Sequence, residues 1–257
     1  GTHHPKLLHG DILFEHAWFA YHDQNWVLKD ISFHIKPGET LALVGATGAG
    51  KSSIINILNR FYEINKGSIQ IDGLDIREYR LEYLRSKITT VLQDTFLFSD
   101  SIANNITLNN PQITREQLIA TAKEVGAHDF IERLPGGYDY NVMERGATLS
   151  IGQAQLISFI RALVYDPKIL VLDEATSSID TETEELIQNV LHKLMQKRTS
   201  IIIAHRLSTI QNADKIIVLD HGEIKEMGSH QELLKLNKYY KRLYDLQFNS
   251  DGIAKTV

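Results

Sequence analysis

The sequence predicts an α/β fold whose sheet is largely parallel. Five short apolar runs, rich in β-branched residues, recur along the 257-residue chain at residues 40–45, 87–93, 168–174, 199–205 and 215–220. Runs of this length and polarity are typical of strands buried on both faces of a sheet. Helical patterns lie between them, and strands that alternate with helices favour right-handed βαβ units.

Two helices are expected from the residue pattern. Residues 51–62 open directly after a glycine-rich loop. Residues 181–197 place apolar side chains at helical spacing, begin with acidic residues and end with lysine. The charges of this second segment complement the helix dipole at both ends. We expect both segments to be helices that cover the sheet.

Two further regions differ from this alternation. Residues 11–36 and 66–78 read as short alternating strands between turns, which predicts an antiparallel annex. Residues 101–165 lack strong strand signals, which indicates an α-helical subdomain inserted into the core. We therefore expect a tag or linker at 1–10, a core with the annex at 11–93 and 162–245, the helical subdomain at 94–161 and a C-terminal tail at 246–257.

The composition narrows the functional classes. Lys and Arg number 27 against 32 Asp and Glu, a formal net charge of −5, so no basic surplus favours nucleic acid or an anionic membrane surface. The chain has no cysteine, which excludes disulfides and cysteine-ligated zinc. It also lacks an apolar run of about 18 residues, the length that suggests a membrane span.

A glycine-rich loop follows the first buried run. Residues 45–53, GATGAGKSS, fit the pattern G-x-x-x-x-G-K-[ST] between a strand and a helix. Its glycines permit a tight loop whose N–H groups form an anion nest, and the helix adds the positive end of its dipole. Lys51 is expected to reach the β- and γ-phosphates, and Ser52 to bind Mg²⁺. The candidate nucleotide-binding residues are Gly45, Ala46, Thr47, Gly48, Ala49, Gly50, Lys51, Ser52 and Ser53.

Polar side chains end three other buried runs. Asp173 and Glu174 follow a strand that we expect beside the strand of the phosphate loop, where Asp173 can hold Mg²⁺. Glu174 can act as the general base that polarises a water against the γ-phosphate. His205 ends another run at the carboxyl edge of the sheet and is expected beside these acids. Gln93 ends a third run, where its amide can ligate Mg²⁺ or the attacking water.

With these residues in place, the chain resembles the nucleotide-binding domain of ATP-binding cassette (ABC) transporters over about residues 11–245, with the motifs in the family's order. The resemblance implies a P-loop NTPase (RecA-like) core and assigns Tyr21, with Val27 nearby, to adenine stacking. Residues 149–153, LSIGQ, resemble the LSGGQ signature. The remaining motifs match the Walker A loop (45–53), the Q-loop (Gln93), the Walker B strand end (Asp173 and Glu174), the D-loop (177–180) and the switch histidine (His205).

The signature implies a partner. In the family, two domains pair head to tail, and each signature covers the ATP held by the other domain's Walker A loop. Ser150 would donate its hydroxyl and Gly152 its N–H to that γ-phosphate, aided by the dipole of a helix at about 153–163. By the same resemblance, Gln153 supports the loop and Asp180 also contacts the nucleotide across the dimer. The structural alternative is an N-cap serine, which uses the same helix end.

Ile151 departs from the family, which most often has glycine at this position. A β-branched residue strongly disfavours a positive φ. If the loop needs that conformation, Ile151 weakens the contact with the partner; otherwise it packs at the interface. Some exporters pair unlike halves with one impaired site, so both a homodimer and a heterodimer stay open.

Several segments resemble exporter domains more than importer or soluble ABC proteins. Glu144–Gly146 lies where exporters contact the transmembrane coupling helices, as does the segment around Gln93. The resemblance implies an ATPase that uses ATP and Mg²⁺ to power export from the cytoplasmic face of the cell membrane. The alternatives are a soluble ABC ATPase without a transport role, which the acidic balance disfavours, and a non-hydrolysing regulatory cassette, which Glu174 and His205 disfavour.

Overall fold

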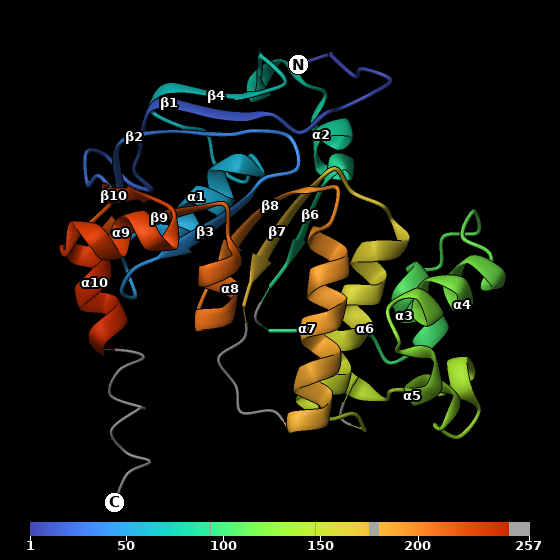
Figure 1. Cartoon of the computed structure of the whole chain (residues 1–257). Coiled ribbons are helices and arrows are strands. Elements are labelled where there is room, and N and C mark those ends of the chain that lie inside the picture. Colours follow the sequence, from blue (N-terminus) through green and yellow to red (C-terminus); the bar gives the residue numbers. More distant parts are fainter. Residues whose placement is uncertain (93, 147, 175–179, 247–257) are drawn as a thin grey trace, which may run out of the picture.

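The computed structural model describes residues 1–92, 94–146, 148–174 and 180–246. At its centre lies a six-stranded sheet with the order β10-β9-β3-β8-β7-β6 (Figure 1). The five predicted runs form its parallel strands, and β10 pairs antiparallel with β9 at one edge, which confirms the α/β class. The strands are Thr40–Val44 (β3), Ile88–Val91 (β6), Ile169–Asp173 (β7), Thr199–Ile203 (β8), Lys215–Asp220 (β9) and Glu223–Gly228 (β10).

Strand β8 lies between β3 and β7. We expected the strand that ends in Asp173 to lie directly beside the strand of the phosphate loop, and this expectation is wrong. Five parallel strands of similar length and burial carry no mark of their order in the sequence. The expected position of His205 is confirmed, because Asp173 pairs in register with Ile203, two residues before the histidine.

An antiparallel sheet of order β2-β1-β4-β5 lies over one face of the parallel sheet, and helix α1 lies between the two (Figure 1). It occupies the two regions predicted for the annex. Its strands are Ile12–Phe19 (β1), Leu28–Ile35 (β2), Lys66–Ile71 (β4) and Leu74–Asp75 (β5), and α1 spans Lys51–Leu58.

The central strands are buried on both faces. In β3, the side chains of Leu41 and Leu43 pack in the core shared with α1 and the antiparallel sheet. Ala42 and Val44 pack in the second core, among the helices of the opposite face. Successive side chains of a strand point to opposite faces, so burial of both faces explains the unbroken apolar runs.

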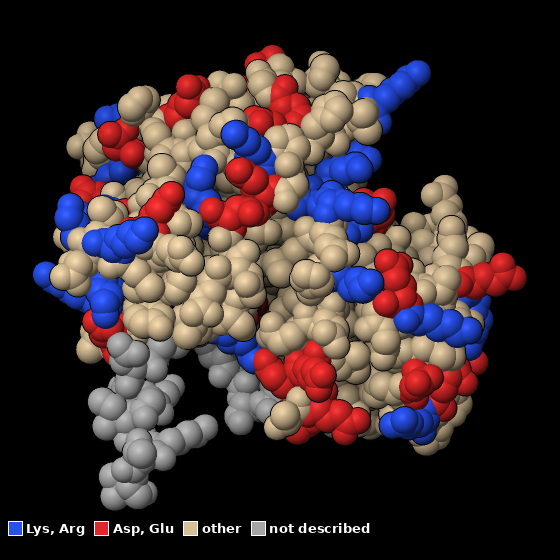
Figure 2. Space-filling model, viewed as in Figure 1, with Lys and Arg blue, Asp and Glu red and all other residues tan. Residues whose placement is uncertain are grey.

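Helices α6, α7 and α8 cover the opposite face of the parallel sheet, and α3, α4 and α5 form a lobe beside α6 (Figure 1). Within the described residues, every helix is too short or too polar to span a lipid bilayer. Acidic and basic side chains are interspersed over the face shown in Figure 2. The helices are Leu81–Lys87 (α2), Ile102–Thr107 (α3), Arg115–Glu124 (α4), His128–Glu132 (α5), Ile151–Val164 (α6), Thr181–Met195 (α7), Leu207–Asn212 (α8), His230–Leu236 (α9) and Tyr239–Tyr244 (α10).

Two features bear on the expected domain bounds. The first ten residues, set aside as a tag or linker, pack against the antiparallel sheet region: Leu8 is buried, and the His3 carbonyl accepts the Arg80 N–H at 2.8 Å. Helix α6 runs through the bound we expected at residue 161, so the helical lobe and the core share one continuous helix.

Candidate active site

The phosphate loop joins β3 to α1. Gly45, Gly48 and Gly50 have φ angles of 153°, 83° and 111°, values that L side chains rarely adopt. A Cβ on Gly45 would lie 2.3 Å from the Leu219 carbonyl oxygen, and one on Gly50 would lie 2.7 Å from a methyl carbon of Leu28. A Cβ on Gly48 would meet nothing within 4 Å. Backbone conformation and close packing therefore explain the glycines at the two ends of the loop.

The start of α1 has unsatisfied N–H groups. Its N-cap, Gly50, supplies no side-chain hydrogen bond, and the first turn contains no acidic residue. The first N–H groups of a helix lack partners within the helix, so this end suits an anion. Residues 46–48 at the loop tip are exposed, and so is Ser52, whereas Ala49 is buried.

Lys51 is the cation of the loop. Its Nζ donates to the Gly45 carbonyl oxygen at 2.5 Å. Burial lowers the pKa of Lys51, and the negative charge of Asp173 opposes that shift. The loop lysine and the acid at the end of β7 therefore lie close enough to interact electrostatically.

His205 and Asp173 meet at the carboxyl edge of the sheet. His205 Nε2 lies 3.8 Å from Asp173 Oδ1, and both side chains are partly exposed. Gln93 follows β6, whose last residue Val91 pairs with Leu172, but the glutamine itself lies outside the described residues. The structure thus brings together three of the predicted groups: Lys51, Asp173 and His205.

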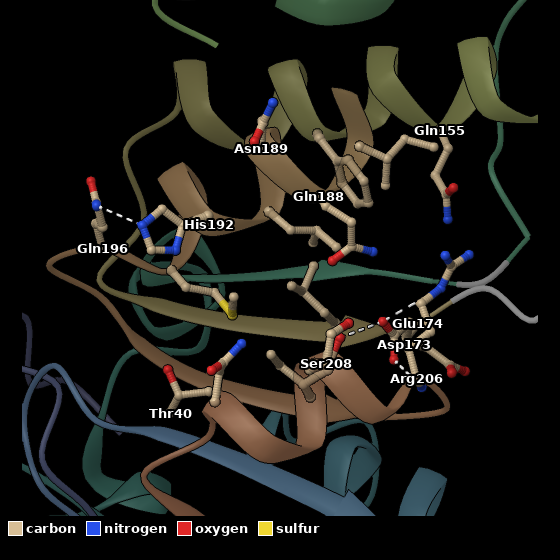
Figure 3. A pocket seen from close by; sticks show the side chains of 18 residues that line it. Thr40, Gln155, Asp173, Glu174, Gln188, Asn189, His192, Gln196, Arg206 and Ser208 are labelled. Carbon is tan, nitrogen blue, oxygen red and sulfur yellow. Dashed lines mark hydrogen bonds and ion pairs between the residues drawn. The ribbon is translucent and has the colours of Figure 1, made fainter. Parts of the chain in front are cut away.

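Glu174 is buried beside these groups and bonded to the start of α8 (Figure 3). Its Oε2 accepts hydrogen bonds from the backbone N–H groups of His205 and Arg206, at 2.8 and 3.0 Å. Its Oε1 accepts a bond from the Thr209 hydroxyl at 2.6 Å. The sequence reasoning did not identify Thr209 as a functional residue. No local signal in the sequence marks it, because its partner Glu174 lies 35 positions earlier in the chain.

The predicted adenine-stacking tyrosine lies against α1. The Tyr21 hydroxyl shares a hydrogen bond with the buried Ser53 hydroxyl at 3.0 Å and accepts one from Asn56 Nδ2 at 3.1 Å. Its ring meets that of Tyr62 edge-on, with centroids 4.9 Å apart. Val27 is partly buried, and its N–H donates to the Phe19 carbonyl at 2.8 Å. Asn56 and Tyr62 were not predicted as parts of this site.

The signature residues form a capping box at the start of α6, which begins at Ile151 rather than at 153. Ser150 Oγ accepts the Gln153 N–H at 3.2 Å, and Gln153 Oε1 accepts the Ser150 N–H at 3.1 Å. A hydroxyl that accepts one bond can still donate its proton, so Ser150 keeps a donor for another molecule. The N–H groups of Ile151 and Gly152, in the first turn, lack partners within the helix.

Ile151 adopts the helical conformation and exposes 62% of its surface. It is absent from the residues of positive φ in the described part of the chain. Asp180, the described residue of the D-loop, caps α7 by accepting the Thr183 N–H at 2.9 Å, and this bond lowers its pKa. Residues 177–179 of the D-loop lie outside the described residues.

Comparisons with known proteins agree with this geometry. A family model described as ABC transporter matches residues 28–177. The chain belongs to the ABC transporter family. This ABC domain has an ATP-binding fold of the exporter type, a class whose characteristic activity is ATP hydrolysis.

Individual relatives support the exporter type. The domain is 51% identical over 238 residues to a probable multidrug resistance ABC transporter ATP-binding/permease protein of Bacillus subtilis, covering 93% of this chain and 35% of that protein. It is 48% identical to an ATP-dependent lipid A-core flippase of Haemophilus influenzae, covering 97% and 43% respectively. A solved bacterial Atm1-family ABC exporter with ATP bound matches with a TM-score of 0.86 and 39% identity, over 96% of this chain and 44% of that one. The chain therefore spans less than half the length of these relatives.

Proposed function

We propose that this ABC domain binds and hydrolyses ATP in a head-to-tail dimer and so powers export through membrane-spanning partner domains at the cytoplasmic face of the membrane. The observation that carries the proposal is the meeting of Lys51, Asp173 and His205 at the mouth of the phosphate loop. The relatives support the transport role, since their names are those of exporters and a flippase.

The loop and its neighbours suit the binding of ATP with Mg²⁺. The N–H groups of the loop and of the first turn of α1 would bind the phosphate oxygens, with Lys51 at the β- and γ-phosphates. Ser52 and Asp173 offer the oxygen ligands that Mg²⁺ prefers, and Gln93 is the third proposed ligand. The ion, when bound, neutralises charge that develops on the β- and γ-phosphates. Tyr21 would stack on the adenine.

Hydrolysis needs a base and a group that senses the γ-phosphate. In our proposal, a carboxylate oxygen of Glu174 accepts a proton from the attacking water, while the water oxygen bonds to the γ-phosphorus and ADP leaves. His205 Nε2 would hydrogen-bond to the γ-phosphate and orient it. The partner domain would complete the site with Ser150, Gly152 and the start of α6.

The surface near Gln93 supports contact with membrane-spanning domains. Leu92, Phe96 and Phe98 are exposed there, and a groove of about 470 Å³ runs between β6 and α6. Gly146, in the turn Glu144–Gly146, packs against Leu97, since a Cβ on this glycine would lie 2.9 Å from Leu97 Cδ1. The segment around Leu97 and the one at Glu144–Gly146 are therefore neighbours, which would suit a single coupling element.

A steady-state phosphate-release assay with the variant Glu174→Gln tests the catalytic part of the proposal. We expect the variant to bind ATP, to lose turnover and to elute as a trapped dimer on a sizing column in ATP. Glu185→Gln, an exposed acid on α7, is the matched control and should keep the wild-type rate. An unchanged rate in Glu174→Gln would remove the base assignment, and a wild-type chain without turnover at any concentration would favour the regulatory cassette.

A further inference from the structure

The carboxylate of Glu174 is buried against α8 and the two residues that precede it. Only 4% of its side chain is exposed, although a general base must reach a water molecule. Oε2 accepts two backbone N–H groups, from His205 and Arg206, and Oε1 accepts the hydroxyl proton of Thr209. A carboxylate oxygen has about two acceptor sites, so the protein itself occupies both sites of Oε2.

These bonds also serve the helix. α8 begins after Arg206, whose side chain forms no capping hydrogen bond. One N–H group at this helix start, that of the N-cap Arg206, finds its acceptor in Glu174, 32 residues earlier in the chain. Release of the carboxylate therefore leaves the N–H groups of His205 and Arg206 without this acceptor, and movement of the segment that leads into α8 in turn frees the carboxylate.

His205 belongs to this segment and directly precedes the N-cap Arg206. Its side chain faces Asp173, while its backbone N–H is bonded to Glu174. A shift of His205 toward a γ-phosphate moves this N–H group and that of Arg206 together. The movement of His205 toward the nucleotide and the release of Glu174 are thus coupled, because both displace the backbone of residues 205–206.

The surroundings leave room for such a shift. A cavity of about 670 Å³ lies between α6, α7 and α8 and reaches Asp173 and Glu174 (Figure 3). Across it, the Arg206 guanidinium forms an ion pair with Glu184 of α7, while its Nε lies 3.7 Å from Glu174 Oε1. Asp180 of the D-loop caps the same helix, α7. The helix that follows the D-loop therefore contacts Arg206, whose backbone N–H is bonded to Glu174.

We propose that Thr209 is a positioning residue that, with the first turn of α8, holds Glu174 in a resting arrangement until His205 moves. The inference rests on the proposed function, in which Glu174 is the base. It makes the hydroxyl of Thr209 a restraint on turnover: the bond to Oε1 is present at rest and is broken before the proton transfer.

Three variants of the 257-residue chain test this restraint by steady-state ATPase kinetics. Thr209→Val keeps the shape of the side chain and removes the hydroxyl, Thr209→Ser keeps the hydroxyl, and Ser208→Ala removes an exposed hydroxyl one residue earlier. We expect kcat to rise roughly three- to tenfold in Thr209→Val, an effect on the scale of the net contribution of one ordinary hydrogen bond. The KM for ATP should stay within about twofold. Thr209→Ser and Ser208→Ala should match the wild type.

A fall in kcat, or no change, in a folded Thr209→Val chain overturns the inference, and so does an equal rise in Thr209→Ser. If the valine variant does not fold, Thr209→Ala takes its place with the same expectation. Addition of Thr209→Val to Glu174→Gln should give no gain over Glu174→Gln alone. Full activity in Glu174→Gln would instead refute the proposed function, so the two failures are distinguishable.

Discussion

Ser150 has a capping role in the fold and a second role in the proposed dimer; one substitution removes both, and the fold allows us to separate them. In its own chain it caps α6, with the Gln153 N–H at 3.2 Å. In the proposed dimer it donates its hydroxyl to another chain's γ-phosphate. Ser150→Ala should lower the free energy of unfolding by about 1 kcal/mol through loss of the cap. For a chain of this size, that corresponds to a fall in Tm of roughly 2–4 °C.

The fold supplies a matched control at the start of α9. Ser229 Oγ accepts the Glu232 N–H at 3.2 Å, and Glu232 Oε2 accepts the Ser229 N–H at 2.9 Å, so the geometry repeats that of Ser150 and Gln153. Ser229→Ala should therefore lose the same stability. It should keep its ATPase rate, because this helix end has no role in the proposed nucleotide site.

The two roles of Ser150 then appear in different measurements. Loss of one hydrogen bond to a charged phosphate should lower kcat/KM roughly ten- to 150-fold in Ser150→Ala. Ser150→Asp should keep the cap and the Tm but repel the γ-phosphate, so it should be folded and inactive. Thermal melts and phosphate-release assays on the three variants decide the matter. If Ser150→Ala and Ser229→Ala hydrolyse ATP equally fast, Ser150 is a structural cap alone.

Four further outcomes follow from the described geometry. Gly45→Ala should lower Tm more than Gly48→Ala, because only the first Cβ meets a backbone carbonyl, at 2.3 Å; equal melts would contradict this. Ile151→Gly should leave kcat within about twofold, since the residue is already helical and exposed, and a large rise would show that the isoleucine impairs closure. Lys51→Met should abolish the ATP-induced rise in Tm. It should not lower the Tm of the free chain, because burial already disfavours the charged form of Lys51 and lowers its pKa. Burial also lowers the pKa of His230, so the unfolded chain binds the proton more readily than the folded chain. The free energy of unfolding should therefore fall as the pH drops below about 6.5. His230→Gln should flatten that slope in thermal melts between about pH 5 and 7.5.

The sequence predicts those parts of the fold that depend on local patterns. The buried strands, the glycines at 45 and 50, and the helix start at Ser150 all follow from burial periodicity, backbone sterics or capping chemistry. The order of the strands does not, because strands such as β7 and β8 are equally apolar and differ only in their neighbours.

The candidate site divides in the same way. Lys51 after the glycine-rich loop, with Asp173 and His205 each at the end of a buried run, is enough to indicate phosphate chemistry. The bond from Thr209 to Glu174 joins residues 35 positions apart, and no local pattern marks it. The packing of Leu8 is a similar tertiary effect, which composition alone cannot distinguish from a linker.

The continuity of α6 has a mechanical consequence. Its 14 residues make a rod of about 21 Å, with the signature at its N-terminal end and, after a short connection, the start of β7 beyond the other. A tilt of about 10° at its C-terminal end displaces Ser150 by roughly 4 Å, more than the length of a hydrogen bond. In the proposed dimer, rotation of the helical lobe would thus act as a lever: a small angular change at the C-terminal end of α6 in one chain would open or close the nucleotide site of the other.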